Sequence, residues 1–402
     1  MTSSSFTNYP ANYPSQSSRP VKPGADDIEP AIAAVLERSL RKRQHGPYSA
    51  RTDAQVRSGL ERLFAAQGYR GVVVQDLRRL AGGASKEMFC FSVRHDALDA
   101  AERLVLRMDP LESIIETSRQ REAEALMAAR AVVPAPLVRY LDQAGEFLGQ
   151  SALITSFVEG VTQPSDQGGS GVSGLGTNYG AAVARIAPQF LDNLMAIHTL
   201  DWRAARLPSF QAPDAYPQQA ALWQTNWYER IWLQDAAEAI PLASLVRQWL
   251  RENAPPCTDL CFIHGDYRMG NFMFDEASGD MTAVLDWELA HIGDFHEDIA
   301  YVTQKLFGRV DEQGRFLCCG LFTREEFLHR YQQLSGRSIK PQVLHYYEVL
   351  NAWKSVVHTF ASCLRVANAG NNHQDVLLSW LAPVGHILLN EIVGYLKGTK
   401  RS

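Results

Sequence analysis

The spacing of apolar residues predicts that the ordered part of the chain opens with helices and continues with short strands. Within residues 32–40 and 56–64 the apolar positions recur every three or four residues, which is the period of a helix with one buried face. Residues 72–74, 88–93 and 104–107 are short β-branched or aromatic runs separated by glycine or charged turns. This order predicts an antiparallel meander.

The segment that follows completes a small unit of helices and strands. Residues 118–132 have the pattern of a charged helix, and the Pro-Ala-Pro sequence at 134–136 would stop it. Strands are expected to return at residues 147–148 and 152–157.

The second half of the chain is predicted to be mostly helical. In residues 190–200, 220–232 and 242–250 the apolar positions again recur at three and four. Two short apolar runs, residues 260–263 and 281–285, have the composition of strands, and each leads directly into a cluster of acids and amides.

These patterns predict an α+β fold with three regions. Residues 1–27 are rich in Ser, Pro, Asn and Tyr and are expected to form a disordered arm. Residues 28–158 are expected to form an N-terminal lobe with leading helices, and residues 159–402 a larger, mainly helical C-terminal lobe.

Composition and charge exclude several classes of protein. The chain has 402 residues, of which 46% are hydrophobic and 21% charged, so collagen-like, disordered and disulfide-scaffold classes do not fit. With 39 Lys+Arg against 44 Asp+Glu, the net charge is −5. Because no long basic block is present either, we expect no nucleic-acid partner.

The apolar runs and the cysteines indicate a cytoplasmic protein. No stretch approaches the roughly 18 consecutive apolar residues of a membrane span, and the first residues lack the apolar core of a signal peptide. The six cysteines include no CxxC pair, which suits reduced thiols. We therefore expect a cytoplasmic protein with no membrane partner; the oligomeric state is not readable.

Two polar clusters carry the candidate chemistry. His264-Gly265-Asp266 opens the first cluster and Asn271 closes it, while Asp286 follows the next predicted strand. A carboxylate, an amide five residues later and a second carboxylate form a set of hard oxygen ligands suited to Mg²⁺ beside a phosphate chain. The pattern therefore favours phosphoryl transfer.

Each residue of these clusters can be given a role in that reaction. Asp266 would accept the proton of an attacking hydroxyl, and Asn271 and Asp286 would hold magnesium. Arg268 would neutralise the charge that develops on the transferred group.

From about Leu80 to about Leu381 the chain resembles the aminoglycoside phosphotransferase family of kinase-like enzymes. Three motifs carry the resemblance, in the order and spacing of the family: His-Gly-Asp-x-x-x-x-Asn ending at Asn271, Leu285-Asp286-Trp287-Glu288, and Gly293-Asp294 to Asp298. Further segments resemble a branch that includes kinase-like domains fused to acyl-CoA dehydrogenases and bacterial hydroxyacyl-CoA kinases: Val105-Leu106-Arg107, Arg121-Glu122, Pro134-Ala135-Pro136, Trp249-Leu250 and Tyr346-Tyr347-Glu348.

The resemblance implies a bilobal protein-kinase-like fold that uses ATP, or GTP, and Mg²⁺. The small lobe would contain an antiparallel sheet and bind the nucleotide, with the adenine at the junction of the lobes. The large helical lobe would bind the hydroxyl acceptor.

The family also implies which residues bind the nucleotide. A loop of Gly82, Gly83, Ala84 and Ser85 would close over the phosphates. The family usually has a lysine at the position of Arg107, whereas that branch commonly has an arginine there. Arg107 would hold the α- and β-phosphates, with Glu122 as its ion-pair partner. The backbone of Phe157 and Val158, in the connector between the lobes, would meet the adenine.

Other polar residues are better explained by structure than by chemistry. We expect His264 to brace its loop, and Asp298 to anchor the same loop by accepting backbone N–H bonds, as its family position implies. Glu288 could provide packing and a turn contact, or bind a second metal through water. The literal GxGxxG at residues 169–174 follows no strand, which favours a flexible loop or a substrate lid.

The sequence therefore predicts an ATP- and Mg²⁺-dependent phosphotransferase acting on a hydroxyl group of a small molecule. Resemblance to the branch and the apolar, aromatic segment 208–233 favour a hydroxyacyl-CoA or another mainly apolar alcohol as the acceptor. Aromatic residues of this segment recur about every four positions and so form a stripe on one face of a helix. We expect this stripe to pack in the core; the alternative is that it forms a wall of the substrate site. An aminoglycoside or macrolide kinase, a choline- or homoserine-type kinase and a non-catalytic nucleotide-binding scaffold remain as alternatives.

Overall fold

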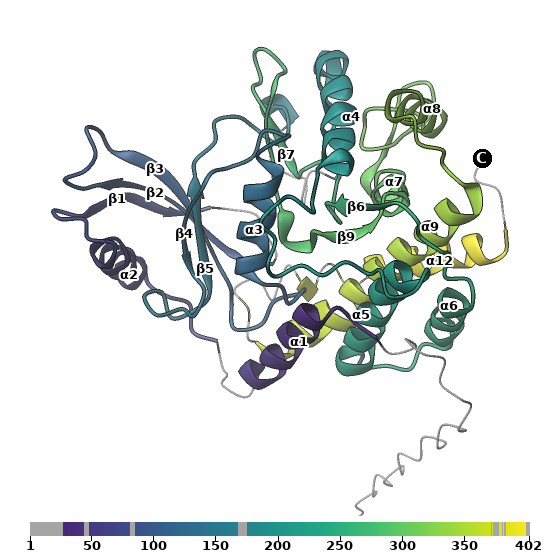
Figure 1. Cartoon of the computed structure of the whole chain (residues 1–402), viewed down its shortest axis with the longest axis horizontal. Coiled ribbons are helices and arrows are strands. Elements are labelled where there is room, and N and C mark those ends of the chain that lie inside the picture. The colour runs from purple at the N-terminus through teal and green to yellow at the C-terminus, as the bar shows by residue number, and fades with distance from the viewer. Residues whose placement is uncertain are drawn as a thin grey trace, which may run out of the picture.

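The chain forms two lobes of unequal size, as the sequence predicts. A computed structural model describes residues 27–43, 48–80, 85–167, 175–370, 372, 378–379, 381 and 383–398. Figure 1 shows the sheet of the small lobe on the left and the larger, mainly helical lobe on the right. The predicted arm at 1–27 lies outside these residues except for Asp27, and so does the GxGxxG segment.

The small lobe is built on a five-stranded antiparallel sheet in the order β1-β2-β3-β5-β4. The first three strands are consecutive neighbours, so the predicted meander is confirmed. The elements of this part of the chain are α1 (Pro30–Lys42), α2 (Asp53–Ala66), β1 (Val73–Arg79), β2 (Glu87–Arg94), β3 (Glu102–Met108), α3 (Arg119–Ala129), β4 (Val138–Asp142) and β5 (Ala152–Ser156).

Alternation along β3 determines which side chains reach the junction of the lobes. Leu104, Leu106 and Met108 are fully buried and belong to the core that α2 forms with this sheet. Because successive side chains of a strand point to opposite faces, Arg107 points away from α2. On β5 the same alternation directs Leu153 into the core that contains α3.

The predicted strand at residues 147–148 is wrong, because these residues form a turn. The backbone N–H groups of Glu146, Phe147 and Leu148 donate to the carboxylate of Asp142 at 2.8 to 3.0 Å. A side chain that satisfies three backbone donors competes with strand pairing. The fifth strand is β4, which ends at Asp142 and which the pattern of apolar residues did not reveal.

The first helix packs against the large lobe. Ile32 and Leu36 of α1 belong to the same core cluster as the helices of that lobe. Just before α1, Asp27 accepts a hydrogen bond from Trp223 Nε1 of helix α5 at 2.8 Å, and Figure 1 shows α1 beside that helix. The division predicted from the sequence groups α1 with the small lobe, whereas these contacts join it to the large one.

Among the described residues, the large lobe consists of helices and three short antiparallel strand pairs. Its helices are α4 (Val183–Thr199), α5 (Gln219–Asp235), α6 (Pro241–Glu252), α7 (His296–Val302), α8 (Arg324–Ser335), α9 (Pro341–Val356), a π-helix (Val357–Cys363), α10 (Leu364–Ala369) and α12 (Val384–Leu396). Short 3₁₀ helices lie at Ser165–Gln167, Gly180–Ala182, Trp287–Leu289 and Lys305–Phe307. The strands are β6 (Leu260–Ile263), β7 (Phe272–Phe274), β8 (Met281–Val284), β9 (His291–Asp294), β10 (Arg309–Val310) and β11 (Phe316–Leu317).

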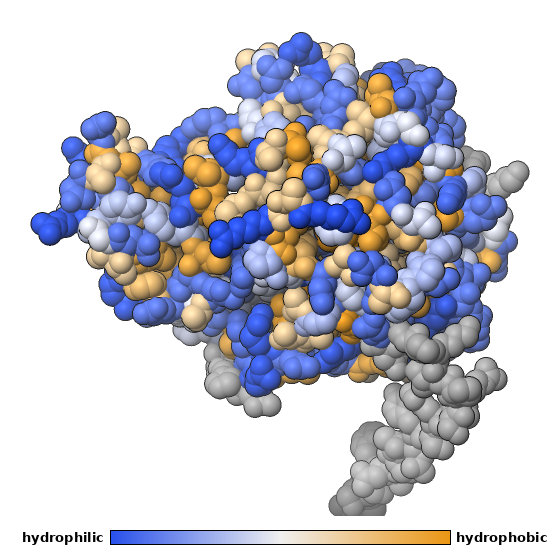
Figure 2. Space-filling model, in the orientation of Figure 1, coloured by the Kyte–Doolittle hydropathy of each residue, from blue (hydrophilic) through white to orange (hydrophobic). Residues whose placement is uncertain are grey.

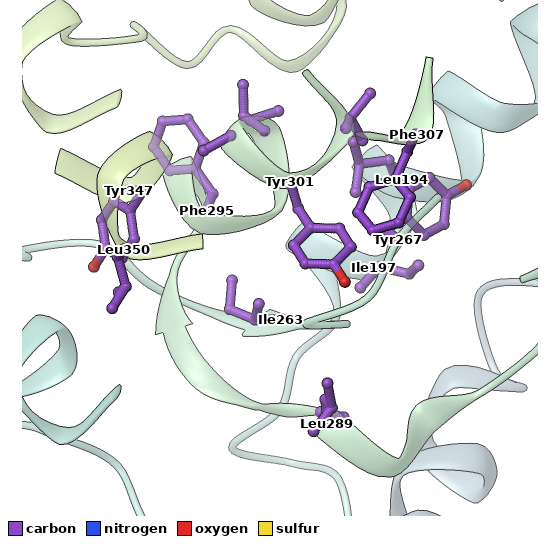
Figure 3. Packing of buried hydrophobic residues seen from close by; sticks show 14 of the residues in the cluster. Leu194, Ile197, Ile263, Tyr267, Leu289, Phe295, Tyr301, Phe307, Tyr347 and Leu350 are labelled. Atoms are coloured by element: carbon purple, nitrogen blue, oxygen red, sulfur yellow. The ribbon is translucent and has the colours of Figure 1, made fainter. Parts of the chain in front are cut away.

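Pairing of these strands brings the two polar clusters together. β6 pairs with β9, and β7 pairs with β8, both antiparallel. The first cluster therefore spans the connection from β6 to β7, and Asp286 follows β8. Figure 3 shows the packing beneath, with Ile263 of β6, Leu289 and Tyr301 of α7 in one buried cluster.

The aromatic stripe of α5 lies in the core. Trp227, Tyr228 and Trp232 are almost completely buried in the large-lobe cluster, as expected for simple packing. On the face shown in Figure 2, hydrophilic and apolar residues are mixed over both lobes. Within the described ranges, no helix is both long enough and apolar enough to traverse a bilayer.

Candidate active site

The turn after β6 has a backbone that requires glycine. Gly265 has φ +82°, and a Cβ atom there would lie 2.6 Å from the carbonyl oxygen of Leu289. Both conditions exclude a side chain, the first because L-residues rarely adopt positive φ and the second because backbone cannot yield as a flexible side chain can. The glycine of the His-Gly-Asp motif therefore allows close approach to the segment that follows Asp286.

Asp298 anchors the same turn from helix α7, as predicted. Its carboxylate accepts the backbone N–H of His264 at 2.8 Å and that of Gly265 at 2.9 Å. It also lies 3.2 Å from Nε2 of His198, and Asp298 is completely buried. Burial alone would raise the pKa of Asp298, but the hydrogen bond with His198 and the charge of that ring bring the pKa below its usual value.

His264 braces the loop as a neutral imidazole. Its Nδ1 accepts the backbone N–H of Asp266 at 3.2 Å, so the ring proton is on Nε2, which donates to the carbonyl oxygen of Leu285 at 2.9 Å. Burial lowers the pKa of His264, which favours this neutral form. The ring thus links the first cluster to the residue before Asp286.

Three side chains hold the carboxylate of Asp266. Arg268 Nε donates to Oδ1 at 2.8 Å, and Asn271 Nδ2 donates to Oδ2 at 2.6 Å. The hydroxyl of Tyr301 also donates to this carboxylate. Burial raises the pKa of Asp266, and the nearby charge of Asp286 adds to that effect. A fixed carboxylate with a raised pKa has the properties of a general base.

Asp286 lies directly beside this group in a strained conformation. The backbone N–H of Leu285 donates to the carbonyl oxygen of Asn271 at 2.8 Å, which sets the two predicted metal ligands next to each other. Asp286 has φ +64°, in the left-handed region that non-glycine residues seldom occupy. Such strain is retained mainly where function requires it.

Arg107 spans the junction of the lobes. Its Nε lies 2.9 Å from Glu122 of α3, so the predicted ion pair is present. Its Nη2 donates to Asp286 Oδ1 at 2.8 Å. The guanidinium is thus held between a carboxylate of the small lobe and one of the large lobe.

The structure describes only some of the residues that are predicted to bind the nucleotide. Gly82, Gly83 and Ala84 lie outside the described residues. Ser85, which follows them, donates its hydroxyl to Glu288 Oε1 at 3.0 Å. Phe157 donates its backbone N–H to the carbonyl oxygen of Arg103 at 3.1 Å. Neither Phe157 nor Val158 lines the cleft between the lobes. Adenine binding by these two residues stays a prediction.

A cleft of about 490 Å³ runs between the lobes past these groups. The predicted residues Ser85, Arg107, Asp266, Arg268, Asn271 and Asp286 line it together. The remaining lining includes Lys86, Met88, Ile114, Ile115, Thr162, Gln163, Glu288, Leu289, Tyr301, Leu306, Phe307, Ser355, His358, Thr359, Cys363, Leu381 and Leu388. The aromatic residues of α5 are not among them.

Most of the chain matches a known protein family. Residues 76–349, more than half of the chain, match the family described as "Phosphotransferase enzyme family". The chain belongs to the phosphotransferase enzyme family. Acyl-CoA dehydrogenase family member 10 of Mus musculus is 30% identical over 208 residues, which are 50% of this chain and 18% of the mouse protein. This phosphotransferase-family chain therefore matches less than a fifth of that relative.

Two solved structures named as aminoglycoside phosphotransferases have a similar fold. A candidate aminoglycoside phosphotransferase from Ralstonia eutropha superposes with a TM-score of 0.58 at 19% identity, covering 85% of this chain and 98% of that one. A thermostable mutant of an aminoglycoside phosphotransferase, in ternary complex with ADP and hygromycin B, gives 0.53 at 16% identity, covering 85% and 100%. The predicted bilobal kinase-like fold is confirmed.

The oxygen ligands at the cleft suit a magnesium ion bound together with a nucleotide. Among the described residues, no cluster of three or more His, Cys, Asp and Glu side chains could form a site made of protein alone. Magnesium in phosphoryl-transfer sites needs only one or two protein oxygens, because phosphates and water supply the rest. Asp286 is the more accessible of the two predicted ligands, with 26% of its side chain exposed, and Asn271 uses its Nδ2 for Asp266, leaving Oδ1 for a cation.

Sequence reasoning missed Tyr301 and the role of Glu288. Tyr301 follows Asp298 by three residues on α7, and this spacing places both on one side of the helix, toward the loop that carries Asp266. That periodicity could have identified Tyr301. Nothing in the sequence identifies the partners of Glu288, because they lie about 170 to 200 positions away.

Proposed function

We propose that this chain is an ATP- and Mg²⁺-dependent phosphotransferase that phosphorylates a hydroxyl group of a small molecule. The observation that carries the proposal is the carboxylate of Asp266, which is held by Arg268, Asn271 and Tyr301 at the cleft and has a raised pKa. A base in this position accepts the proton of the attacking hydroxyl. Arg107 binds the phosphates of the nucleotide, and Arg268 neutralises charge that develops on the transferred group.

Asn271 and Asp286 are the residues that would hold magnesium. The ion, when bound, neutralises charge on the phosphates. Asp286 would then exchange its contact with Arg107 for one with the ion, while Glu122 would keep the guanidinium of Arg107 in place.

The acceptor is proposed to be a hydroxyacyl-CoA or another mainly apolar alcohol. Much of the lining away from the catalytic residues is apolar, including Ile114, Ile115, Leu306, Phe307, Leu381 and Leu388. The acidic groups of the described lining are Asp266, Asp286 and Glu288, and each already pairs with a cation. A polycationic aminoglycoside would therefore find no free carboxylate among them. The relative named for acyl-CoA supports the same choice.

The test is acceptor-dependent ATP consumption by the purified chain with Mg²⁺. The panel would contain hydroxyacyl-CoA thioesters of several chain lengths, hygromycin B, a macrolide, choline and homoserine. We expect turnover with a hydroxyacyl-CoA, and a loss of about 10²- to 10⁴-fold in the Asp266→Asn variant with nucleotide binding retained. Undiminished turnover by Asp266→Asn would contradict the mechanism, and turnover only with an antibiotic or choline would contradict the acceptor class.

A further inference from the structure

The carboxylate of Glu288 joins the turn that carries Asp286 to the small lobe. Its Oε1 accepts the hydroxyl of Ser85 at 3.0 Å, next to the predicted nucleotide loop. Its Oε2 accepts Thr117 Oγ1 and Arg119 Nη2, both at 2.7 Å, and lies 3.1 Å from Lys86 Nζ. Both oxygens are therefore occupied by groups of the protein.

Two ion-pair connections run in parallel between this turn and the small lobe. The first goes from Asp286 to Arg107 and on to Glu122. The second goes from Glu288 to Arg119 at the start of α3, and Arg119 also pairs with Glu122. Glu122 is thus the shared partner of both arginines, and the two connections form one ring.

The two connections differ in their access to the cleft. Asp286 is 26% exposed, whereas Arg119 is fully buried and the side chain of Glu288 is 6% exposed. The inner connection is therefore the more enclosed of the two, and it does not depend on the contact between Arg107 and Asp286.

We infer that Glu288 is a positioning residue for the nucleotide, acting through Arg119, Glu122 and Ser85 and not as a metal ligand. It holds α3, and hence the partner of Arg107, against the turn that carries Asp286, and it fixes the end of the phosphate loop at Ser85. This inference rests on the proposed nucleotide site. It predicts that loss of the Glu288 carboxylate weakens nucleotide binding while the requirement for Mg²⁺ and the affinity for the acceptor stay unchanged.

The experiment compares Glu288→Gln with a matched variant, Glu297→Gln. Glu297 is also a buried carboxylate in an ion pair, with Lys354, but its partners lie in the large-lobe core. Binding of ADP with Mg²⁺ is measured by calorimetry, and KM for ATP, KM for the acceptor and the Mg²⁺ concentration for half-maximal activity are measured by turnover. We expect Glu288→Gln to weaken ADP binding and to raise KM for ATP at least tenfold, with the other two constants changed less than threefold. Glu297→Gln should leave all of them within threefold.

A milder variant covers the case in which Glu288→Gln does not fold. Thr117→Val removes one hydrogen bond to Glu288 and keeps the shape of the side chain, and it should weaken ADP binding about threefold. Unchanged ADP binding in the variants that fold, an equal loss in Glu297→Gln, or a shifted Mg²⁺ requirement would overturn the inference alone. A wild-type chain that binds no ADP would overturn the proposed function itself.

Discussion

Arg107 Nη2 donates to Asp286 Oδ1 at 2.8 Å across the junction of the two lobes. These residues are the proposed ligands of the phosphates and of the metal, and here each neutralises the other. A nucleotide bound with magnesium would supply both replacement partners, phosphate for Arg107 and the cation for Asp286. Binding would therefore replace one ion pair by two others, which limits the desolvation cost of each group.

Replacing Asp286 should separate the effect of the metal from that of the nucleotide. In the Asp286→Asn variant, we expect Mg²⁺ to lose its effect on ADP binding, because the carboxylate that attracts the cation is gone. Binding without metal should persist, since Arg107 keeps its contact with Glu122. Calorimetric titration of ADP with and without Mg²⁺ measures both, and an unchanged effect of Mg²⁺ would show that Asp286 is not a ligand.

The rate of transfer should depend on the ionisation of Asp266. Burial raises the pKa of Asp266 above the ordinary value of 3.8 for an aspartate, and a general base must be deprotonated to act. Activity should fall as the pH decreases through this raised pKa, because the base is then protonated. The profile of kcat/KM against pH measures it, and an acidic limb centred at or below 3.8 would contradict the assignment.

Removing the charge of Asp298 should displace the catalytic loop. In Asp298→Asn, one of the backbone donors of His264 and Gly265 would face an amide N–H₂ group, and we expect a loss of about 3 kcal/mol in the free energy of unfolding. Turnover should fall with little change in nucleotide affinity, because the loop carries Asp266.

A surface aspartate provides the control for that change. Asp311 accepts the backbone N–H groups of Gln313 and Arg315 in an exposed turn. Urea unfolding of Asp311→Asn should show a change of less than about 1 kcal/mol. Equal destabilisation by the two substitutions would argue against an anchoring role for Asp298.

Gly265→Ala should lower the free energy of unfolding by more than its positive φ alone explains. Gly265 and Gly314 have φ +82° and +77°, but the new Cβ would lie 2.6 Å from the oxygen of Leu289 at the first site and meet nothing within 4 Å at the second. Gly314→Ala should destabilise the chain by about 1 kcal/mol, as expected for a left-handed residue. Gly265→Ala should lose more stability and most of its activity. Thermal unfolding and turnover of the two variants decide this, and matching losses would refute the close approach.

Local patterns were sufficient for the elements that depend on neighbouring residues. The meander, the helices α3 to α6 and the strands β6 and β8 follow from spacing within about ten residues, because a buried face repeats with the period of the element. The turn at 147–148 was misjudged, since Asp142 offers the backbone a partner that apolar spacing does not reveal.

The sequence by itself determined the family motifs, the elements with a clear apolar period and the residues of the proposed catalytic loop, because these are encoded in short segments. Only the tertiary structure decided that α1 packs on the large lobe and that Glu288 binds Ser85 from 203 positions away. Buried ion pairs between distant segments depend on how whole lobes pack, and no local periodicity carries that information.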